Sequence, residues 1–327
     1  MSARDFSRMP LRWRIVAAFA AIYLIWGSTY LAIHFAIETI PPYLMGGVRF
    51  LMAGGILYGV LRWRRVPLPS RIQWRAALIV GGLLLFGGNG GVIVAEQYVP
   101  SGLAALLIAT VPLWMVLLNW NRGDRHRPNI GTSIGLGLGM LGIGLIALPG
   151  ISADTGKINP IGLVVLLLAS LSWAIGSLYS RRADLPSDAL LATSMEMLAG
   201  GALMLMAGLL LGQGGQIQLN LITLRSLAAL GYLVIFGSLI GFTAYVWLLK
   251  VSTPARVSTY AFVNPVVAVI LGWVFAGEAL SARMLIAAAI IILAVVLITI
   301  NQATRRPAPA IDLSIGDATE PQLIENT

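Results

Sequence analysis

Ten apolar segments, each about long enough to cross a lipid bilayer, follow one another along this chain of 327 residues. A helix needs about 20 apolar residues to span the hydrocarbon core of a membrane. Backbone groups inside lipid must bond to one another, so each segment is expected to be a helix. The predicted spans are residues 15–37, 43–61, 76–98, 101–120, 131–149, 159–180, 188–211, 226–249, 254–276 and 283–301. The sequence therefore predicts an all-α integral membrane protein with ten transmembrane helices.

The amino-acid composition agrees with burial in lipid. Hydrophobic residues make up 58% of the chain and charged residues 11%, whereas typical soluble domains have about 25% charged residues. The 36 glycines suit close packing of helices in a bilayer. The chain has no cysteine and two histidines, so we expect no disulfide, no metal site and no cofactor.

The second half of the chain repeats the pattern of the first. Corresponding features are Trp26 and Trp173, Arg49 and Glu196, Gly54 and Gly201, Ser101 and Pro254, and Pro112 and Pro265. Five helices in each half is an odd number, so the second half enters the membrane from the opposite face. We therefore expect two inverted five-helix repeats, residues 15–150 and 159–302, with a site at their interface. An N-terminal segment of residues 1–14 and a disordered tail of residues 303–327 flank them.

The basic residues gather in alternate connections between the spans. Most of the 22 Lys and Arg residues fall on one side of the ten-helix arrangement, and the other side carries only Lys157, Arg225 and Arg283. By the positive-inside rule, both termini are then cytoplasmic. The net charge of +9 thus reflects topology, and we expect a lipid bilayer as partner and no nucleic acid.

Ionisable side chains at membrane depth are candidates for coupling or gating, because they are costly there. Glu96 lies near the outer end of the third span, shortly before Ser101, where the fourth span starts. The amides at that start are suited to receive an anionic group or Glu96 itself. We expect Glu96 to bind a proton or cation; the alternative is an interfacial carboxylate that caps a helix. His34 and Glu38 share a helix face and are a second candidate for a proton-sensitive pair.

Arg49 and Glu196 are a further pair, with opposite charges at equivalent repeat positions. They either form an ion pair inside the membrane or are satisfied separately by other polar groups. Arg49 is close enough to its helix end for its side chain to reach the interface. We favour a structural or gating role for both over contact with a substrate.

Aromatic and polar residues within the spans are candidates for the wall of a substrate cavity. Trp26 and Trp173 offer flat apolar surfaces to a ligand, although they equally well fill space between helices. The further cavity candidates are Ser28, Thr29, Asn89, Ser177, Tyr179, Tyr245, Tyr260 and Asn264. Any one of these groups alone is more often bonded to a neighbouring helix than to a substrate.

Proline and glycine give further local predictions. Pro112 and Pro265 each free a carbonyl inside a span and predict helix kinks; for Pro112, whose neighbours are apolar, a simple packing kink is favoured. Gly131, Gly135 and Gly139 recur every fourth residue, as on the contact face of one helix. The run GGNGG at residues 87–91 resembles a phosphate loop only superficially, and close helix packing is the better interpretation.

Several stretches resemble the ten-helix drug/metabolite transporter superfamily and, within it, the EamA-domain exporters. They are IWGSTY in the first span, PPYLMGGVRFLMAGG in the second, GGNG with AEQYVPSGLAALL and VPLW, and TPARVSTYAFVNPVVAVILGWVFAGEAL in the second half. The resemblance covers about residues 15–302. It implies cytoplasmic termini, a cavity between the halves, and export of small metabolites or drugs across a bacterial inner membrane. Members often end the fourth helix of each half with a Gly-Glu turn; Gly277 and Glu278 match it, whereas the first half has Asn121 to Asp124.

Two other functional classes fit the residues less well. A membrane-embedded enzyme would need a cluster of catalytic groups, and a passive channel would need a continuous polar pore. The few dispersed polar groups instead favour one occluded, mainly apolar site for a small-molecule substrate. The chain also lacks the Gly-x4-Gly-Lys-Ser/Thr motif of ATPases. We therefore expect a secondary active transporter that works by alternating access, with proton- or solute-coupled exchange.

Overall fold

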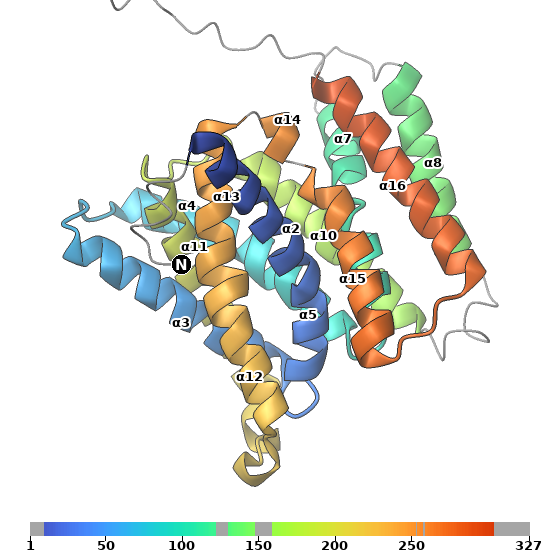
Figure 1. The fold of residues 1–327 in the computed structure, drawn as a ribbon. Helices are drawn as coiled ribbons and strands as arrows, with labels where there is room; N and C mark the ends of the chain where they lie inside the picture. Colours follow the sequence, from blue (N-terminus) through green and yellow to red (C-terminus); the bar gives the residue numbers. More distant parts are fainter. Residues whose placement is uncertain (1–9, 122–129, 148–158, 253, 258, 304–327) are drawn as a thin grey trace, which may run out of the picture.

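The computed structural model describes residues 10–121, 130–147, 159–252, 254–257 and 259–303, and these ranges contain helices and no strand (Figure 1). The helices before residue 150 are α2 (Leu11–Ala36), α3 (Pro42–Trp63), α4 (Arg71–Gly81), η1 (Gly82–Asn89), α5 (Gly90–Ala95), α6 (Ser101–Ile108), α7 (Val111–Asn121) and α8 (Ile130–Ala147). Those that follow are α10 (Pro160–Ser180), α11 (Ala189–Leu210), η2 (Gln213–Gln216), η3 (Leu219–Leu221), α12 (Leu224–Tyr232), η4 (Leu233–Ile240), α13 (Gly241–Val251), α14 (Pro254–Val257), α15 (Tyr260–Ala276) and α16 (Ala282–Ala303).

Eight helical stretches in the described part of the chain are long and apolar enough to cross a membrane. They are Leu11–Ala36, Pro42–Trp63, Arg71–Ala95, Ser101–Leu118, Pro160–Ser180, Ala189–Leu210, Leu224–Val251 and Ala282–Asn301. Two shorter apolar helices, Ile130–Leu145 and Tyr260–Ala276, lie where the fifth and ninth spans were predicted. The prediction of an all-α protein with transmembrane helices is confirmed. The predicted tail and most of the N-terminal segment lie outside the described residues.

The third predicted span begins five residues earlier than expected, at Arg71, because of a capping box. The Ser70 hydroxyl accepts a hydrogen bond from the Gln73 backbone N–H at 3.2 Å, and the Ser70 N–H donates to the Gln73 side chain at 2.9 Å. These two bonds satisfy amides that the first turn of a helix leaves free. The hydropathy pattern missed this start because the first turn of α4 is polar.

Two π-helical segments interrupt the long spans at corresponding places in the chain. The segment η1 joins α4 to α5, and η4 joins α12 to α13, each over eight residues. π-Helices are rare and usually last a single turn, often at functional sites. The sequence analysis did not predict either segment. Both widen the helix next to glycines, Gly87 and Gly88 in η1 and Gly237 in η4.

The two span prolines behave differently from each other. Pro265 lies inside α15, as the predicted kink requires. Pro112 is instead the second residue of α7, after a break that separates this helix from α6 at Ile108. A proline in the first turn of a helix costs no backbone bond, because that N–H would be free in any case. The predicted span thus continues from Ser101 to Leu118, and its helix is interrupted just before Pro112.

Glycines let several helix pairs approach closely, as their spacing predicted. A Cβ atom at Gly135 would lie 2.8 Å from Ile298 of α16, and one at Gly139 would lie 2.0 Å from Leu113 of α7. Accordingly, α8 and α16 run side by side along one edge of the molecule (Figure 1). A Cβ atom at Gly91 would lie 2.7 Å from Ala169 of α10. The GGNGG run is therefore a packing surface.

One close crossing joins α3 to α11 through glycines from both helices. A Cβ atom at Gly54 would lie 2.9 Å from the Met197 Cβ and 3.0 Å from the Ser194 carbonyl oxygen. A Cβ atom at Gly201 would lie 2.9 Å from the Leu51 backbone nitrogen. Gly54 and Gly201 are the pair that the repeat pattern matched. Close backbone approach of this kind is the main source of helix association in lipid.

We expect Gly54→Ala to lower the thermal stability of the detergent-solubilised protein, because the new methyl group meets fixed backbone atoms of α11. Overpacking of this kind costs about 1–3 kcal/mol. The adjacent variant Gly55→Ala is the control, since a Cβ atom there meets nothing within 4 Å. It should be neutral or slightly stabilising. Equal melting shifts for the two variants would contradict the close α3–α11 crossing.

Candidate functional site

The start of α6 is held by a carboxylate from the loop after α15. The Ser101 N–H donates to Glu278 Oε1 at 2.6 Å, and the Gly102 N–H donates to Oε2 at 3.1 Å. The first amides of a helix have no partner within it and lie at the positive end of its dipole. Glu278 therefore stabilises α6 and ties its first turn to the end of α15.

The Gly-Glu turn places this carboxylate. Gly277 ends α15 with a positive φ of 66°, and the Glu278 N–H donates back to the Gly272 carbonyl at 3.1 Å. Glycine adopts that backbone conformation without strain. A Cβ atom at Gly272 would lie 2.3 Å from Glu278 Oε2 and 3.1 Å from Ser101 Oγ. Two glycines thus make the turn and the room for the carboxylate. The counterpart of this turn in the first half reaches into residues 122–124, outside the described part of the chain.

The structure corrects one of the two roles expected for these amides. They do receive an anionic group, but it is Glu278 and not Glu96. Glu96 lies in the turn between α5 and α6, is 4% exposed, and neither carboxylate oxygen has a hydrogen-bond partner within the protein. The Glu96 carboxylate therefore does not cap a helix. The Ser101 hydroxyl beside it is fully buried and also lacks a partner.

Burial raises the pKa of Glu96 well above its ordinary value. The negative charge of Glu278 adds to this rise in pKa, and the positive charge of Arg49 opposes it. The Tyr30 hydroxyl on α2 is the other titratable group within electrostatic reach. A buried carboxylate without hydrogen bonds favours its protonated form, because water no longer stabilises the charge. Its surroundings therefore favour the neutral form of the Glu96 carboxyl.

Arg49 and Glu196 do not form the ion pair that their charges suggested. The Arg49 Nε donates to Ser238 Oγ of η4 at 3.1 Å, and its guanidinium carbon lies 4.6 Å from the centre of the Phe50 ring. Its Nη1 has no partner within the protein. Glu196 lies where α11 packs on α4, with its carbonyl against Gly81. The predicted ion pair is therefore not formed, and the Arg49 side chain contacts Ser238 and Phe50 instead.

Three predicted cavity residues meet in one aromatic cluster. The ring centre of Trp26 lies 5.2 Å from that of Tyr245 and 5.1 Å from that of Tyr260. Phe242, which the sequence analysis did not single out, adds a fourth ring at 5.3 Å. The Trp26 Nε1 donates to the Gly237 carbonyl of η4 at 3.1 Å. All four rings are partly exposed, so the cluster forms a wall and not a closed core.

The polar cavity candidates near this cluster mostly bond to groups of the protein, within their own helix or on a neighbouring one. Ser28 Oγ donates to the Ile25 carbonyl and lies 2.6 Å from the Tyr232 hydroxyl of α12. Thr29 Oγ1 donates to the Trp26 carbonyl at 2.6 Å. Asn264 differs, since its Oδ1 is buried without a partner. Of these three candidates, only Asn264 keeps a free polar atom for a ligand.

The remaining cavity candidates lie around η1 and α10. Trp173 packs against Gly88 of η1, and the Asn89 side chain donates within its own helix to the Leu84 carbonyl at 3.5 Å. Ser177 offers its carbonyl to the Ser180 hydroxyl, and Tyr179 is 36% exposed. The packing of Trp173 of α10 against η1 thus mirrors that of Trp26 of α2, which packs against Gly241 directly after η4.

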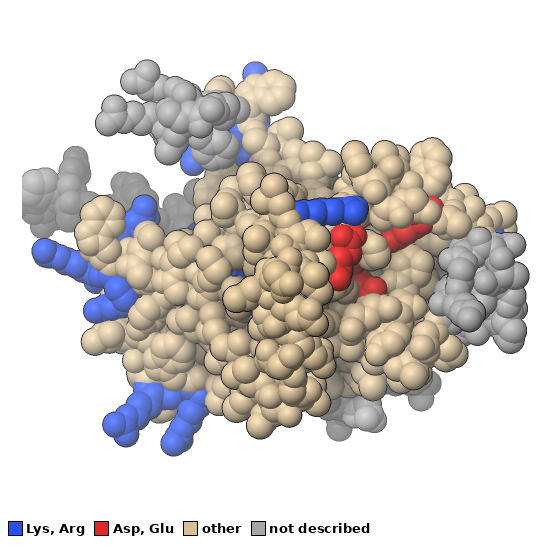
Figure 2. Space-filling model, turned by 90° about the horizontal axis from the view of Figure 1, so that it is seen from below, with Lys and Arg blue, Asp and Glu red and all other residues tan. Residues whose placement is uncertain are grey.

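Contacts between helix ends define one face of the molecule, which we call the acidic face. Glu38, Glu96 and Glu278 lie at the ends of α2, α5 and α15. Tyr43 at the start of α3 bonds to Gln213 after α11, and Asn159 before α10 bonds to Tyr98 after α5. Figure 2 shows the molecule from this side, with acidic atoms beside one extended basic side chain near the middle and further basic side chains toward the left edge. These connections are the ones that the sequence analysis found poor in Lys and Arg.

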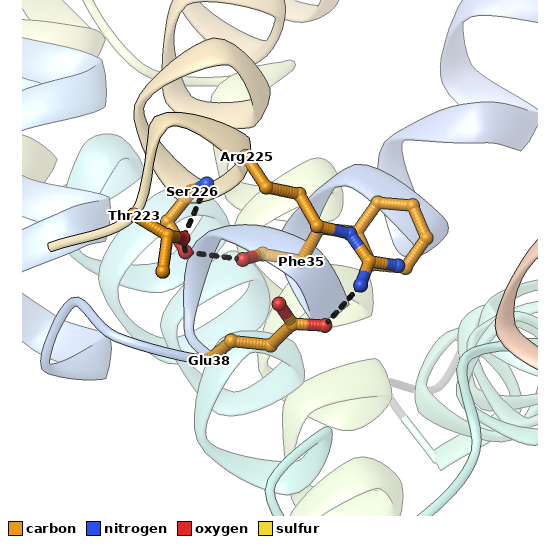
Figure 3. A network of polar contacts seen from close by, with 5 residues as sticks. All are labelled: Phe35, Glu38, Thr223, Arg225 and Ser226. Atoms are coloured by element: carbon orange, nitrogen blue, oxygen red, sulfur yellow. Dashed lines mark hydrogen bonds and ion pairs between the residues drawn. The ribbon is translucent and has the colours of Figure 1, made fainter.

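A second network on the acidic face joins α2 to α12 (Figure 3). Arg225 Nη1 lies 3.3 Å from Glu38 Oε1, and the Arg225 guanidinium carbon lies 3.6 Å from the Phe35 ring centre. Ser226 Oγ donates to the Phe35 carbonyl at 2.8 Å. Glu38 therefore pairs with Arg225 and not with His34, whose Nδ1 is buried without a partner. The expected His34–Glu38 pair is not formed.

We expect charge reversal at Arg49 and Glu196 to give additive effects. Arg49→Glu and Glu196→Arg should each lower the melting temperature of the solubilised protein. Each replaces a side chain that packs between helices by one of the opposite charge, to which the neighbouring groups are not suited. The double variant should lose the sum of the two free energies of unfolding, within about 0.5 kcal/mol. Mutual rescue in the double variant would show that the side chains do pair.

The comparisons with known proteins agree with one another. The sequence profile of the EamA-like transporter family matches residues 13–148 and again residues 160–300. The Escherichia coli K12 protein named "Uncharacterized inner membrane transporter YedA" is 40% identical over 93% of this chain and 97% of its own length. Protein PecM of Dickeya dadantii is 29% identical over 84% of this chain and 88% of its own length.

A solved crystal structure shares the fold, with a TM-score of 0.61 and 22% identity over 87% of this chain and 96% of the other. The WAT1-related chloroplastic protein At3g02690 of Arabidopsis thaliana is 26% identical over 88% of this chain and 69% of its own length. Two profile matches cover most of the sequence, and they occur in a protein with several apolar membrane-length helices. This chain belongs to the EamA-like transporter family.

Proposed function

We propose that this protein is a secondary active transporter that exports small metabolites or drugs across a bacterial inner membrane. The observation that carries the proposal is the double match of the family profile, once to residues 13–148 and once to residues 160–300. Two halves of one family pattern are the arrangement from which alternating access is built. A relative named as an inner membrane transporter supports the location. The function is transport and not catalysis.

We further propose that the halves are inverted repeats of five spans each, residues 15–150 and 159–302. The shorter helices α8 and α15 would then be the fifth and ninth spans. Corresponding features support this symmetry: η1 and η4 interrupt the third and eighth spans, and Gly54 and Gly201 meet at the α3–α11 crossing. Both termini, residues 1–14 and 303–327, would be cytoplasmic, because the acidic face lacks most of the basic residues.

The substrate would bind between the halves, against the aromatic wall of Trp26, Tyr245 and Tyr260. These rings offer apolar and π surfaces, and the free Oδ1 of Asn264 adds one hydrogen-bond acceptor nearby. Trp173 would offer the equivalent surface from the second half. A wall with few polar groups suits a small, mainly apolar or aromatic molecule.

Glu96 would couple transport to a proton gradient. It is a buried carboxylate without hydrogen bonds, and burial raises its pKa, which favours uptake of a proton. If the proton and the substrate exclude one another, one moves out only when the other moves in, which makes exchange obligatory. A passive facilitator would have no use for such a group. The role of Glu96 therefore distinguishes proton-coupled exchange from passive facilitation.

We expect cysteines introduced at Arg64 and Arg182 to be shielded from an impermeant thiol reagent in intact cells, and a cysteine at Gly215 to be labelled. All three positions are exposed, and the parent chain has no cysteine. Arg64 and Arg182 lie in basic connections, whereas Gly215 lies in the connection between α11 and α12 on the acidic face. Permeabilised cells serve as the control, where all three should react. Labelling of Arg64→Cys or Arg182→Cys in intact cells would contradict the proposed topology.

We expect Glu96→Gln to abolish uphill transport while keeping exchange. The amide keeps the shape of a protonated carboxyl but cannot release a proton. The assay is uptake into inverted vesicles, with and without an imposed pH gradient, of a substrate found by a growth-rescue screen. Glu96→Gln should bring the substrate only to equal concentrations on the two sides.

Asp184→Asn is the matched control for this assay, because Asp184 is an exposed carboxylate outside the acidic face. It should concentrate substrate as the parent does. If Glu96→Gln also concentrates substrate to the parent level, Glu96 does not couple transport to protons.

A further inference from the structure

Two carboxylates, one from each half of the chain, interact electrostatically near the start of α6. Glu278 is bound to the amides of Ser101 and Gly102, and Glu96 lies within its electrostatic reach in the turn just before that helix. Each is on a different side of the interface between α6 and α15. The residues differ in one respect: Glu278 has two charge-assisted hydrogen bonds, and Glu96 has no bond at either oxygen.

This difference assigns the charges in the observed conformation. Two amides and the positive end of α6 stabilise a negative charge on Glu278. Glu96 receives no such support, and a second negative charge beside Glu278 would be repelled. The observed arrangement therefore fits an ionised Glu278 and a protonated Glu96.

Arg49 shows where a deprotonated Glu96 would find a partner. Its guanidinium is 3% exposed, donates from Nε to Ser238, and has a free Nη1. Arg49 is the positive charge that acts on Glu96, although no ion pair joins them in this conformation. A buried guanidinium nitrogen without a partner is costly. Small movements that bring Glu96 and Arg49 together would satisfy both groups.

We propose that Glu96 and Glu278 form a single proton-operated gate at the start of α6. With a proton on Glu96, Glu278 stays on the α6 amides and the α6–α15 interface is closed at the acidic face. When Glu96 loses its proton to water at that face, the O–H bond breaks and the carboxylate keeps the electron pair. Arg49 Nη1 then donates to Glu96, Glu278 leaves the amides, and the interface opens.

The gate deepens the proposed transport function by naming the residue that the coupling proton acts on. The groups that face Glu96 are Tyr30 on α2, Arg49 on α3, Ser101 on α6 and Glu278 after α15. Among these, only Glu278 is bonded to the start of a helix from the other half. The Glu278 side chain is therefore the group through which loss of the proton from Glu96 would change the packing of α6 on α15.

The test uses a single cysteine at Ser101, which is fully buried in the closed interface. Protein in lipid nanodiscs exposes both faces, so the measurement depends neither on the orientation in the cell nor on a known substrate. The reaction rate of Ser101→Cys with a polar maleimide reports opening at the start of α6. Adding Glu278→Gln should raise this rate about tenfold, the scale of a lost hydrogen bond to a charged group. Adding Asp184→Asn should leave it unchanged.

The pH response gives a second, independent readout. The pKa of Glu96 is raised in the closed form, so the stability of that form is complete at low pH and is lost as pH rises through this pKa. The labelling rate of Ser101→Cys should therefore increase with pH more steeply than that of Gly215→Cys, an exposed thiol that reports the reagent chemistry alone. Adding Glu96→Gln should remove the excess.

Two results would overturn the gate. In the first, the Glu278→Gln protein keeps its elution profile and melting temperature, and its Ser101→Cys thiol is labelled no faster than with Glu278 in place. The other is an excess pH response that persists in Glu96→Gln. If Glu278→Gln does not fold, the pH series with Glu278 intact decides alone. Transport could still be proton-coupled after either result, so failure of the gate is distinct from failure of the transport proposal.

Discussion

The lack of water in a bilayer is the constraint on which the rest of this structure depends. Every backbone group there needs a partner in the protein, and so the described chain is helical throughout its apolar ranges. Where the helices depart from α geometry, side chains of other helices supply the bonds. The Trp26 indole donates to Gly237 of η4, and the Ser172 hydroxyl donates to Leu83 of η1 at 2.8 Å. The two π segments are thus each held by a first-span helix of the opposite half, α2 or α10.

The contacts between the two halves are of two kinds, rigid and adjustable. The α3–α11 crossing is fixed, because backbone meets backbone at Gly54 and Gly201 with no side chain that could rearrange. The α2–η4 and α10–η1 contacts consist of hydrogen bonds, aromatic rings and side chains that pack on glycines. A widened helix turn can also shift its bonding by one residue more easily than an α-helix can. Movement of one half against the other would therefore pivot near α3 and α11 and be absorbed at η1 and η4.

The sequence predicted what depends on local pattern and missed what depends on distant partners. Span positions follow from hydropathy, and the Gly131–Gly135–Gly139 face follows from helical spacing. The contact between Glu278 and Ser101 joins residues 177 apart, and the contact between Arg49 and Ser238 joins residues 189 apart. No periodicity encodes such pairs. The Gly-Glu turn was visible as a match to the family, but its partner at α6 required the fold. The π segments left no pattern at all, because their composition is that of any apolar helix.

The buried polar atoms without partners describe more than one conformation. They are Arg49 Nη1, both Glu96 oxygens, Ser101 Oγ, His34 Nδ1 and Asn264 Oδ1, and they come from both halves of the chain. Leaving such a group unsatisfied costs about 1–3 kcal/mol, so a protein with a single working conformation would gain by replacing them with apolar residues. Several of them have complementary chemistry: a guanidinium nitrogen, a carboxylate and a hydroxyl. A second conformation in which these groups bond to one another, to a proton or to a substrate would recover the lost free energy. In the proposed alternating access, these unsatisfied atoms would form the bonds of the second conformation, with Asn264 as the contribution of the second half.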